Sequence, residues 1–313
     1  MRRLCNLGMT IISIDKVITS IKSFIDVSSV LEKSDDMQKF LTPQNSVEYL
    51  QRFRSPPQIT ALVFIIPVNL CPLEIYKSIN YMFSQLKSYE TRFLTGISIR
   101  YGKASILCLK QQESIKVLEN LIKIDEPSFI TAYLYLAASI RSPVSHIPSS
   151  IKNPRTFTMS LYYCGINFLL LRDFAMATTQ LQRCILFPCT KDIMPSAIDA
   201  FMLASFLNHY PKQVSYSIIP QKYQIPIHAD SIWNGRDMLF QQNGIEYPRL
   251  YIDLWDCISD ERIRRGILFF SKSSTQIPLD FLLKNIGCYN QEKALSLMKE
   301  CTDFTVCDNI VCF

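Results

Sequence analysis

Apolar residues recur at three- and four-residue spacing through residues 158 to 188, the most regular stretch of the chain. Leu161, Cys164 and Phe168 share one helical face. A polar corner at residues 172–173 follows, after which the spacing resumes. The pattern predicts two antiparallel helices joined by a tight turn. A helical pair this apolar cannot cover its own faces, so we expect neighbouring helices stacked on both sides.

The same periodicity predicts helices over the first 141 residues. An amphipathic helix is expected over 13–33, and Thr42-Pro43 marks the start of a helix around 49–53 that the Ser55-Pro56-Pro57 run ends. Residues 101–118 have a weak echo at 163–181, about two helical-pair repeats later. We therefore expect a right-handed α-solenoid of TPR-like helical hairpins over residues 1–230. Its further helices are predicted at about 58–66, 72–87, 90–109, 112–123 and 126–141.

Proline-rich breaks interrupt the helices at 141–154 and at 210–230. Helices are expected to resume at about 231–241, 247–257 and 259–271. These helices and the residues after them are assigned to a separate C-terminal domain, residues 231–313.

The pattern changes after Ser271. A short helix is predicted over Pro278–Ile286, stopped by Gly287, and a second over Gln291–Cys301. Two short β runs around Asp308-Asn309 end the chain. Two helices followed by a hairpin is the order of a winged helix, which we expect over residues 272–313. The fold class predicted is therefore mainly α, with a terminal β-hairpin.

Composition supports helices and covered surfaces. Apolar residues make up 48% of the chain and charged residues 19%, below the roughly 25% usual for soluble domains. This shortfall suggests surface that partners keep from water. Only eight glycines occur, which argues against sandwiches, barrels and phosphate-binding loops. The net charge of +6 is spread along the chain.

Eleven cysteines, an odd number, are scattered through apolar positions, as expected of reduced thiols in a cytoplasmic or nuclear protein. The apolar run Leu4–Ile14 is broken by polar residues and followed by no small-residue cleavage site, so no signal peptide is expected. No stretch reaches the roughly 18 apolar residues of a membrane span, so a soluble protein is predicted.

The residues of common catalytic and metal sites do not converge in this sequence. No HExxH, GxGxxG or Walker motif is present. The histidines lie in or beside predicted loops: His146, His209 and His228. A zinc site formed by C-terminal cysteines is the alternative considered, but their spacings are wider than the usual pairs, which favours core packing. Those cysteines are Cys288, Cys301, Cys307 and Cys312. No catalytic residue, cofactor or metal is therefore predicted.

Two stretches of the chain resemble one family. Residues 162–166, leading through Leu171-Arg172-Asp173-Phe174 to Ala177, resemble a tyrosine-rich helix, corner and following helix of the proteasome–COP–initiation-factor (PCI) family. Phe281-Leu282-Leu283, with Glu292-Lys293-Ala294 and the closing 308–313, resembles its winged-helix half. The likeness covers roughly residues 90–313.

The resemblance implies a non-catalytic scaffold subunit that binds other PCI-domain subunits in the cytoplasm and nucleus. It is strongest to the COP signalosome, which removes a ubiquitin-like modifier from the cullins of cullin-RING ubiquitin ligases. A structural subunit of the proteasome lid, or of another PCI complex, is the near alternative.

The terminal hairpin and a basic segment are the predicted partner interface. The last strand is expected to leave an unpaired edge for a neighbouring subunit's sheet. The hairpin residues proposed for it are Phe304, Val306, Ile310, Val311 and Phe313. Arginines and aromatic residues, which dominate interface hot spots, add candidates nearby. They are Arg262, Arg264, Arg265, Trp255, Phe269 and Phe270.

A nucleic-acid-binding adaptor is the rival of another class. A winged helix that enters DNA carries several basic residues on its second helix. Here residues 291–300 offer Lys293 and Lys299, offset by Glu292 and Glu300. Little phosphate attraction is therefore expected, so nucleic-acid binding is not predicted.

Overall fold

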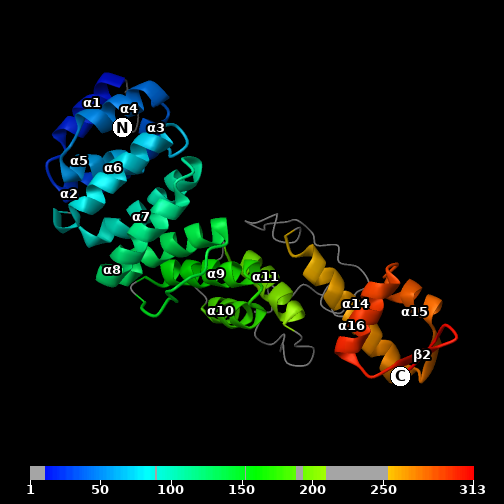
Figure 1. Cartoon of the computed structure of the whole chain (residues 1–313). Helices are drawn as coiled ribbons and strands as arrows, with labels where there is room; N and C mark the ends of the chain where they lie inside the picture. Colours follow the sequence, from blue (N-terminus) through cyan, green and yellow to red (C-terminus); the bar gives the residue numbers. More distant parts are fainter. Residues whose placement is uncertain (1–10, 89, 152, 188–192, 209–252) are drawn as a thin grey trace, which may run out of the picture. The chain divides into compact units, whose positions relative to one another are not determined.

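The computed structural model describes residues 11–88, 90–151, 153–187, 193–208 and 253–313 (Figure 1). The chain is mainly helical and ends in a small three-stranded antiparallel sheet. It divides into two compact units, the N-terminal unit Met1–Asn167 and the C-terminal unit Phe168–Phe313. The predicted boundary at residue 230, the break at 210–230 and the helix at 231–241 lie outside the described residues, as do His209, His228 and most of the helix predicted at 247–257.

The N-terminal unit is built of helices throughout its described residues. They are α1 (Ile11–Ser20), α2 (Phe24–Leu31), α3 (Ser34–Gln38), α4 (Pro43–Arg52), α5 (Pro56–Ile65), α6 (Pro72–Ser84), the 3-10 helix η1 (Leu86–Ser88), α7 (Thr91–Leu107), α8 (Gln111–Ile140) and most of α9 (Pro154–Leu170). The start predicted at Thr42-Pro43 is confirmed, since Thr42 caps α4.

The single helix predicted over 13–33 is wrong, because a capping box divides it into α1 and α2. The N–H of Ser23 donates to the carboxylate of Asp26 (2.8 Å), and the hydroxyl of Ser23 accepts from the N–H of Asp26 (3.4 Å). These side-chain bonds satisfy backbone groups at the start of α2. The local capping signal thus overrides the continuous apolar periodicity.

The predicted helices 112–123 and 126–141 are joined in α8 by a kink. Asp125 has non-helical angles (φ −148°, ψ 81°), two residues before Pro127. Proline lacks an N–H and clashes with the preceding turn, which accounts for the kink. The break predicted between the two helices is therefore confirmed, with helical residues on both sides of it.

Buried aromatic rings and hydroxyl groups join α6, α7, α8 and α9 in the core of the N-terminal unit. Tyr101 is fully buried, stacked on Tyr76 (ring centroids 5.2 Å apart) and edge-on to Phe83 (5.1 Å). The hydroxyls of Thr131 on α8 and Ser160 on α9 lie 2.7 Å apart. Small hydroxyl residues let the helices approach closely while satisfying each other's polar groups.

The C-terminal unit continues with helices and adds the sheet. Its elements are α10 (Phe174–Leu186), α11 (Met194–Leu207), α14 (Trp255–Ser273), β1 (Gln276–Pro278), α15 (Leu279–Ile286), α16 (Gln291–Cys301), β2 (Thr305–Cys307) and β3 (Ile310–Cys312). The break predicted near residue 258 is wrong, because α14 runs through it. Helix α11 was not predicted: nearly all its residues are buried, so the polar face that reveals a helical period is missing.

The tight corner predicted at 172–173 is confirmed. Arg172 adopts a left-handed conformation (φ 64°), and the carboxylate of Asp173 caps α10 by accepting from the N–H of Met176 (3.1 Å). The N–H of Asp173 also bonds the carbonyl of Phe168 (2.9 Å) at the end of α9. These bonds end one helix and start the next within three residues.

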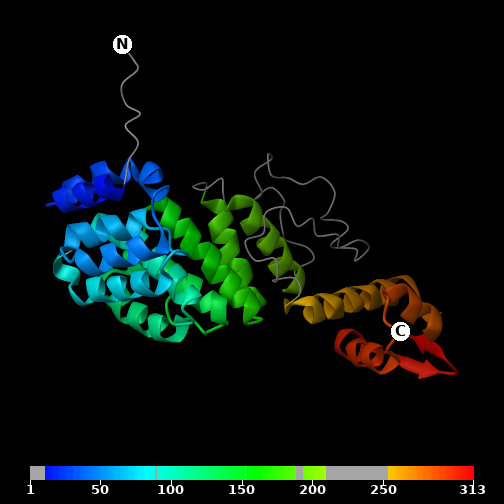
Figure 2. The ribbon, with the colours of Figure 1, turned by 90° about the horizontal axis from the view of Figure 1, so that it is seen from above.

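Residues 255–313, from α14 to β3, form what we call the C-terminal module (Figure 2). Its short helices end and begin as predicted: Gly287 is left-handed (φ 67°) after α15, and Asn290 caps α16. Asp308 and Asn309 both have positive φ, as a type I′ hairpin turn requires. Its core includes Ile263, Ile267, Ile277, Leu279, Leu282, Ile286, Ala294, Leu297, Met298 and Val311.

Candidate partner interface

The free edge predicted for the last strand is not found, because β3 is the central strand of the sheet. The strand order is β1-β3-β2, with Val311 opposite Ile277 on one side and Val306 on the other. A strand of three residues is too short to be predicted from alternating polar and apolar positions. Strand β1 nevertheless pairs with the edge of β3 that the sequence predicts to be free. Among the described strands, the outer edges therefore belong to β1 and β2.

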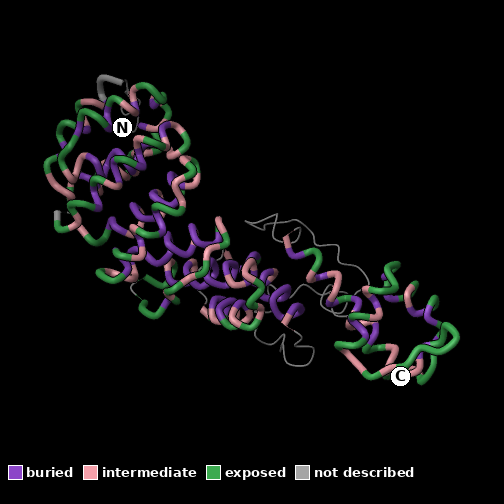
Figure 3. The backbone as a smooth tube through the Cα atoms, viewed as in Figure 1, coloured by how far each residue is buried: buried purple, intermediate pink, exposed green. Residues whose placement is uncertain are grey.

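Strand β2 presents a surface edge of the C-terminal module (Figure 3). All three of its residues are exposed, and the side chain of Val306 is 39% exposed. In a two-residue hairpin the pair that flanks the turn is hydrogen-bonded, here Cys307 with Ile310, and the next pair is not. The N–H of Val306 therefore points away from β3, toward the outer edge.

The hairpin residues chosen from sequence divide into core and surface. Val311 is fully buried in the core of the module. Phe304 and Phe313 are half-buried and pack against that core. Val306 and Ile310 are each 39% exposed. Only the last two are thus placed to contact a partner.

The three predicted arginines do not form one basic patch. Arg264 donates to the carboxylate of Glu300 through Nε (3.2 Å) and an Nη (2.7 Å). Arg265 binds Glu261 (2.9 Å) and the carbonyl at position 206 (2.9 Å). Two of the three side chains therefore hold helices of this chain together.

The third arginine, Arg262, is exposed and lies over the end of α15. A Cβ added to Gly287 would meet an Nη atom of Arg262 at 2.9 Å. The left-handed turn is what favours glycine here, because the guanidinium is the far end of a flexible side chain and could move away from a Cβ.

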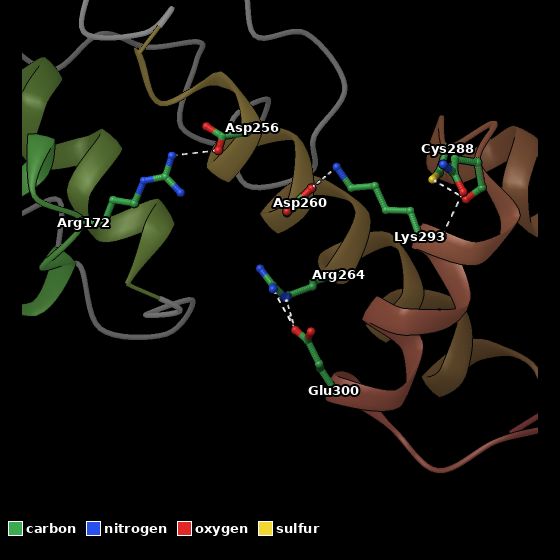
Figure 4. Close-up of polar contacts among 8 residues, drawn as sticks. Arg172, Asp256, Asp260, Arg264, Cys288, Lys293 and Glu300 are labelled. Atoms are coloured by element: carbon green, nitrogen blue, oxygen red, sulfur yellow. Dashed lines mark hydrogen bonds and ion pairs between the residues drawn. The ribbon is translucent and has the colours of Figure 1, made fainter.

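A stripe of charges on α14 holds this helix to its neighbours (Figure 4). Asp256, Asp260 and Arg264 are spaced four residues apart, which places them on one face. Arg172 binds Asp256 (2.8 Å), and Lys293 of α16 binds Asp260. The hydrogen bond with Asp260 raises the pKa of Lys293. Because Asp260 and Arg264 carry opposite charges and pair with Lys293 and Glu300, α16 meets α14 in a defined register.

Exposed aromatic rings lie where α14 meets α15. Phe269 is 67% exposed and contacts Phe270 edge-on (5.4 Å between centroids). Phe270 in turn contacts Phe281 of α15 (6.4 Å), which is 54% exposed. The sequence predicts Phe269 and Phe270, but not Phe281, for this interface. The contact between α14 and α15 joins distant parts of the chain and cannot be predicted from the local pattern of residues.

The described cysteines and histidine can be placed individually. Burial raises the pKa of Cys184 to about 12 and that of Cys71 to about 11, so both thiols are protonated at neutral pH. The thiol of Cys288 donates to the carbonyl of Asn290 (3.3 Å). His146 packs edge-on to Tyr133. Within the described ranges, no group of three potential ligands is placed to hold a metal ion.

No protein-family model matches the chain, and no curated protein matches it either. In the part of the chain that the structure describes, no helix has both the length and the apolarity needed to cross a bilayer.

Proposed function

We propose that this protein is a non-catalytic scaffold subunit of a PCI-type complex, with the COP signalosome as the first candidate. In this proposal the helices before residue 231 stack as TPR-like pairs in a right-handed solenoid. The C-terminal module is a winged helix that joins another subunit of the same class. Binding of other PCI-domain subunits, rather than chemistry on a substrate, is its role.

The observation that carries the proposal is the exposed edge of β2. An unpaired strand edge offers backbone donors and acceptors to an extended segment of another chain. Thr305 and Cys307 flank Val306 there, and all three are exposed. Native proteins usually shield such an edge with charges, proline or a covering element. In the described residues this one carries an apolar side chain at its centre.

The order of elements in the C-terminal module supports the same proposal. Helix α14, strand β1, helices α15 and α16 and the β2–β3 hairpin follow one another as a winged helix requires. The third helix of that series, α16, uses Lys293 in an ion pair with Asp260. This leaves little basic surface on α16, the helix that would enter DNA, which favours a protein partner over nucleic acid.

The edge can be blocked without disturbing the hairpin. Val306→Pro removes an N–H that points outward, and proline is tolerated on an edge strand. Thr305→Ala, an exposed change on the same strand that keeps every backbone donor, is the matched control. Circular dichroism of both purified variants checks that the helices remain.

Affinity purification of the full chain, followed by mass spectrometry, tests the proposal. We expect other PCI-domain subunits with the wild type and with Thr305→Ala, and their loss with Val306→Pro. Cullin-modifier removal by the purified particle indicates the signalosome, whereas proteasome subunits indicate the lid. Recovery of the wild-type chain without any PCI-domain protein would contradict the proposal.

A further inference from the structure

The C-terminal module carries a second exposed surface, formed by α14 and α15 and separate from the β2 edge. We call it the aromatic face and define it by Leu268, Phe269, Phe281, Lys272 and Lys284. Its two phenylalanines are linked through Phe270, whose ring contacts both. Two exposed rings joined through a third form a contiguous apolar patch, unlike the single apolar residues that are scattered over most protein surfaces.

The helical spacing places the lysines beside the rings. Lys272 follows Phe269 by three residues on α14, and Lys284 follows Phe281 by three residues on α15, so each pair shares a face. All four side chains belong to exposed residues. Arg262, two turns before Phe269 on the same side of α14, adds a third cation.

Three of the four acidic groups on α14 and α15 are paired with other cations. On α14, Asp256 binds Arg172 and Asp260 binds Lys293. The third acid of that helix, Glu261, binds Arg265. On α15, the carboxylate of Asp280 accepts from the side-chain amide of Asn309 (2.9 Å).

No ion pair of Lys272, Lys284 or Arg262 occurs among residues 253–313. The aromatic face is therefore apolar at its centre, and its margin has a net positive charge because the Asp280 carboxylate offsets only one of the three cations. A bound partner would bury the two rings against its own apolar side chains. The cations favour a partner that carries negative charge.

We infer that the aromatic face docks an acidic amphipathic segment of a partner protein, with apolar side chains against Phe269 and Phe281 and carboxylates against Lys272 and Lys284. A lipid surface fits less well, because stable binding to anionic membranes takes clusters of four to eight basic residues. A second copy of this chain fits less well too, since two such faces would bring like charges together. This inference does not rest on the β2 edge.

Fluorescence anisotropy with two synthetic peptides tests the inference on the full chain. One peptide is an amphipathic 18-residue helix with Leu and Phe on one face and Glu on the flanks, and the other replaces every Glu with Lys. We expect the acidic peptide to bind and the basic one not to bind. Phe269→Ala with Phe281→Ala should weaken binding at least about tenfold, as expected for loss of two anchors.

Charge reversal gives the sharpest readout. Lys272→Glu with Lys284→Glu should lose the acidic peptide and gain the basic one. The control, Tyr289→Ala with Lys299→Glu, changes an exposed aromatic residue and an exposed lysine outside the face and should leave binding unchanged. Val306→Pro should also bind the acidic peptide normally, so failure of the proposed assembly function remains distinguishable.

Three results would overturn the inference. The first is no binding of the acidic peptide, or equal binding by the charge-reversed variant. The second is a dimer in sedimentation analysis that the double Phe→Ala variant abolishes, because the occupant is then a second copy. The third is flotation with phosphatidylserine vesicles that the same variant abolishes, because the face then binds membrane.

Discussion

Two arginines, one in each unit, bind the C-terminal end of a neighbouring helix in the same way. Arg100 donates to the carbonyls of Phe64 (2.7 Å) and Ile66 (3.1 Å) at the end of α5, and its guanidinium lies 5.4 Å from the ring centroid of Phe64. Arg265 donates to the carbonyl of Phe206 (2.9 Å) at the end of α11 and lies 4.3 Å from that ring. Both cations occupy the negative end of a helix dipole and stack on an aromatic face.

The two sites differ in how the charge is compensated. Arg265 also binds Glu261 (2.9 Å), and the side chains of this pair are 15% and 5% exposed. No carboxylate pairs with Arg100 among the described residues, and burial lowers the pKa of its guanidinium. The C-terminal unit thus uses a buried ion pair where the N-terminal unit uses carbonyls alone. We therefore expect the stability of the Arg265 site, but not that of the Arg100 site, to depend on one particular carboxylate.

Removing Arg265 gives the largest expected effect. Arg265→Met should lower the free energy of unfolding of the C-terminal unit by about 3–5 kcal/mol, because it leaves the buried Glu261 carboxylate without its cation. Urea denaturation measures this loss. Adding Glu261→Gln should restore much of the stability, and a double variant as unstable as Arg265→Met would show that the pair is not the cause.

Removing Arg100 sharpens the contrast with Arg265. Arg100→Met should cost about 2–3 kcal/mol, the range for charge-assisted hydrogen bonds to two carbonyls. Arg100→Lys should recover only part of it, because an ammonium lacks the planar fork that reaches both carbonyls and stacks on Phe64. Full stability of the lysine variant in urea denaturation would contradict this view of the site.

The helix that Arg265 caps also carries a partly buried acid, Asp199. Burial raises its pKa to about 6, so the ionised form is less favourable in the folded protein than in the unfolded chain. The resulting loss of stability is absent below pH 3.8 and grows as pH rises through about 6.

Asp199→Asn should therefore stabilise the protein at pH 7.5, by about 1 kcal/mol after allowance for partial solvent screening, and not at pH 3.5. Thermal unfolding at the two pH values measures the difference. An equal gain at both values would assign it to packing rather than to charge.

The charged stripe of α14 gives the smallest expected effect. Glu300 is half-exposed, so breaking its pair with Arg264 should cost less than about 1 kcal/mol. Arg264→Glu should be destabilising and the exchange Arg264→Glu with Glu300→Arg should recover most of the loss. This recovery of stability should shrink in 1 M salt. A recovery that is the same at low and high salt would contradict an electrostatic origin of the interaction.

Features fixed by local chemistry could be predicted from the sequence. The Thr42-Pro43 start, the corner at Arg172-Asp173, the stop at Gly287 and the Asp308-Asn309 turn all depend on a few adjacent residues, and all are confirmed. The error over residues 13–33 had a local signal as well, in Ser23 and Asp26, but the apolar period was given more weight.

Features that depend on distant partners could not be predicted. The pairing of β1 with β3 joins residues far apart in sequence and decides which strand edge is exposed. Arg264 and Arg265 bind groups on α16 and α11, which are distant in sequence. Of the three arginines in this basic segment, only Arg262 is therefore exposed. Helix α11 is buried on nearly all sides and so carried no amphipathic signal.

The size of the particle that contains this chain in gentle cell extracts tests the central claim most directly. Native mass spectrometry of the tagged full chain should show a mass far above the 36.1 kDa of one copy, made up of other PCI-domain subunits in fixed ratio. A single species at the mass of one chain would contradict its assignment as a scaffold subunit.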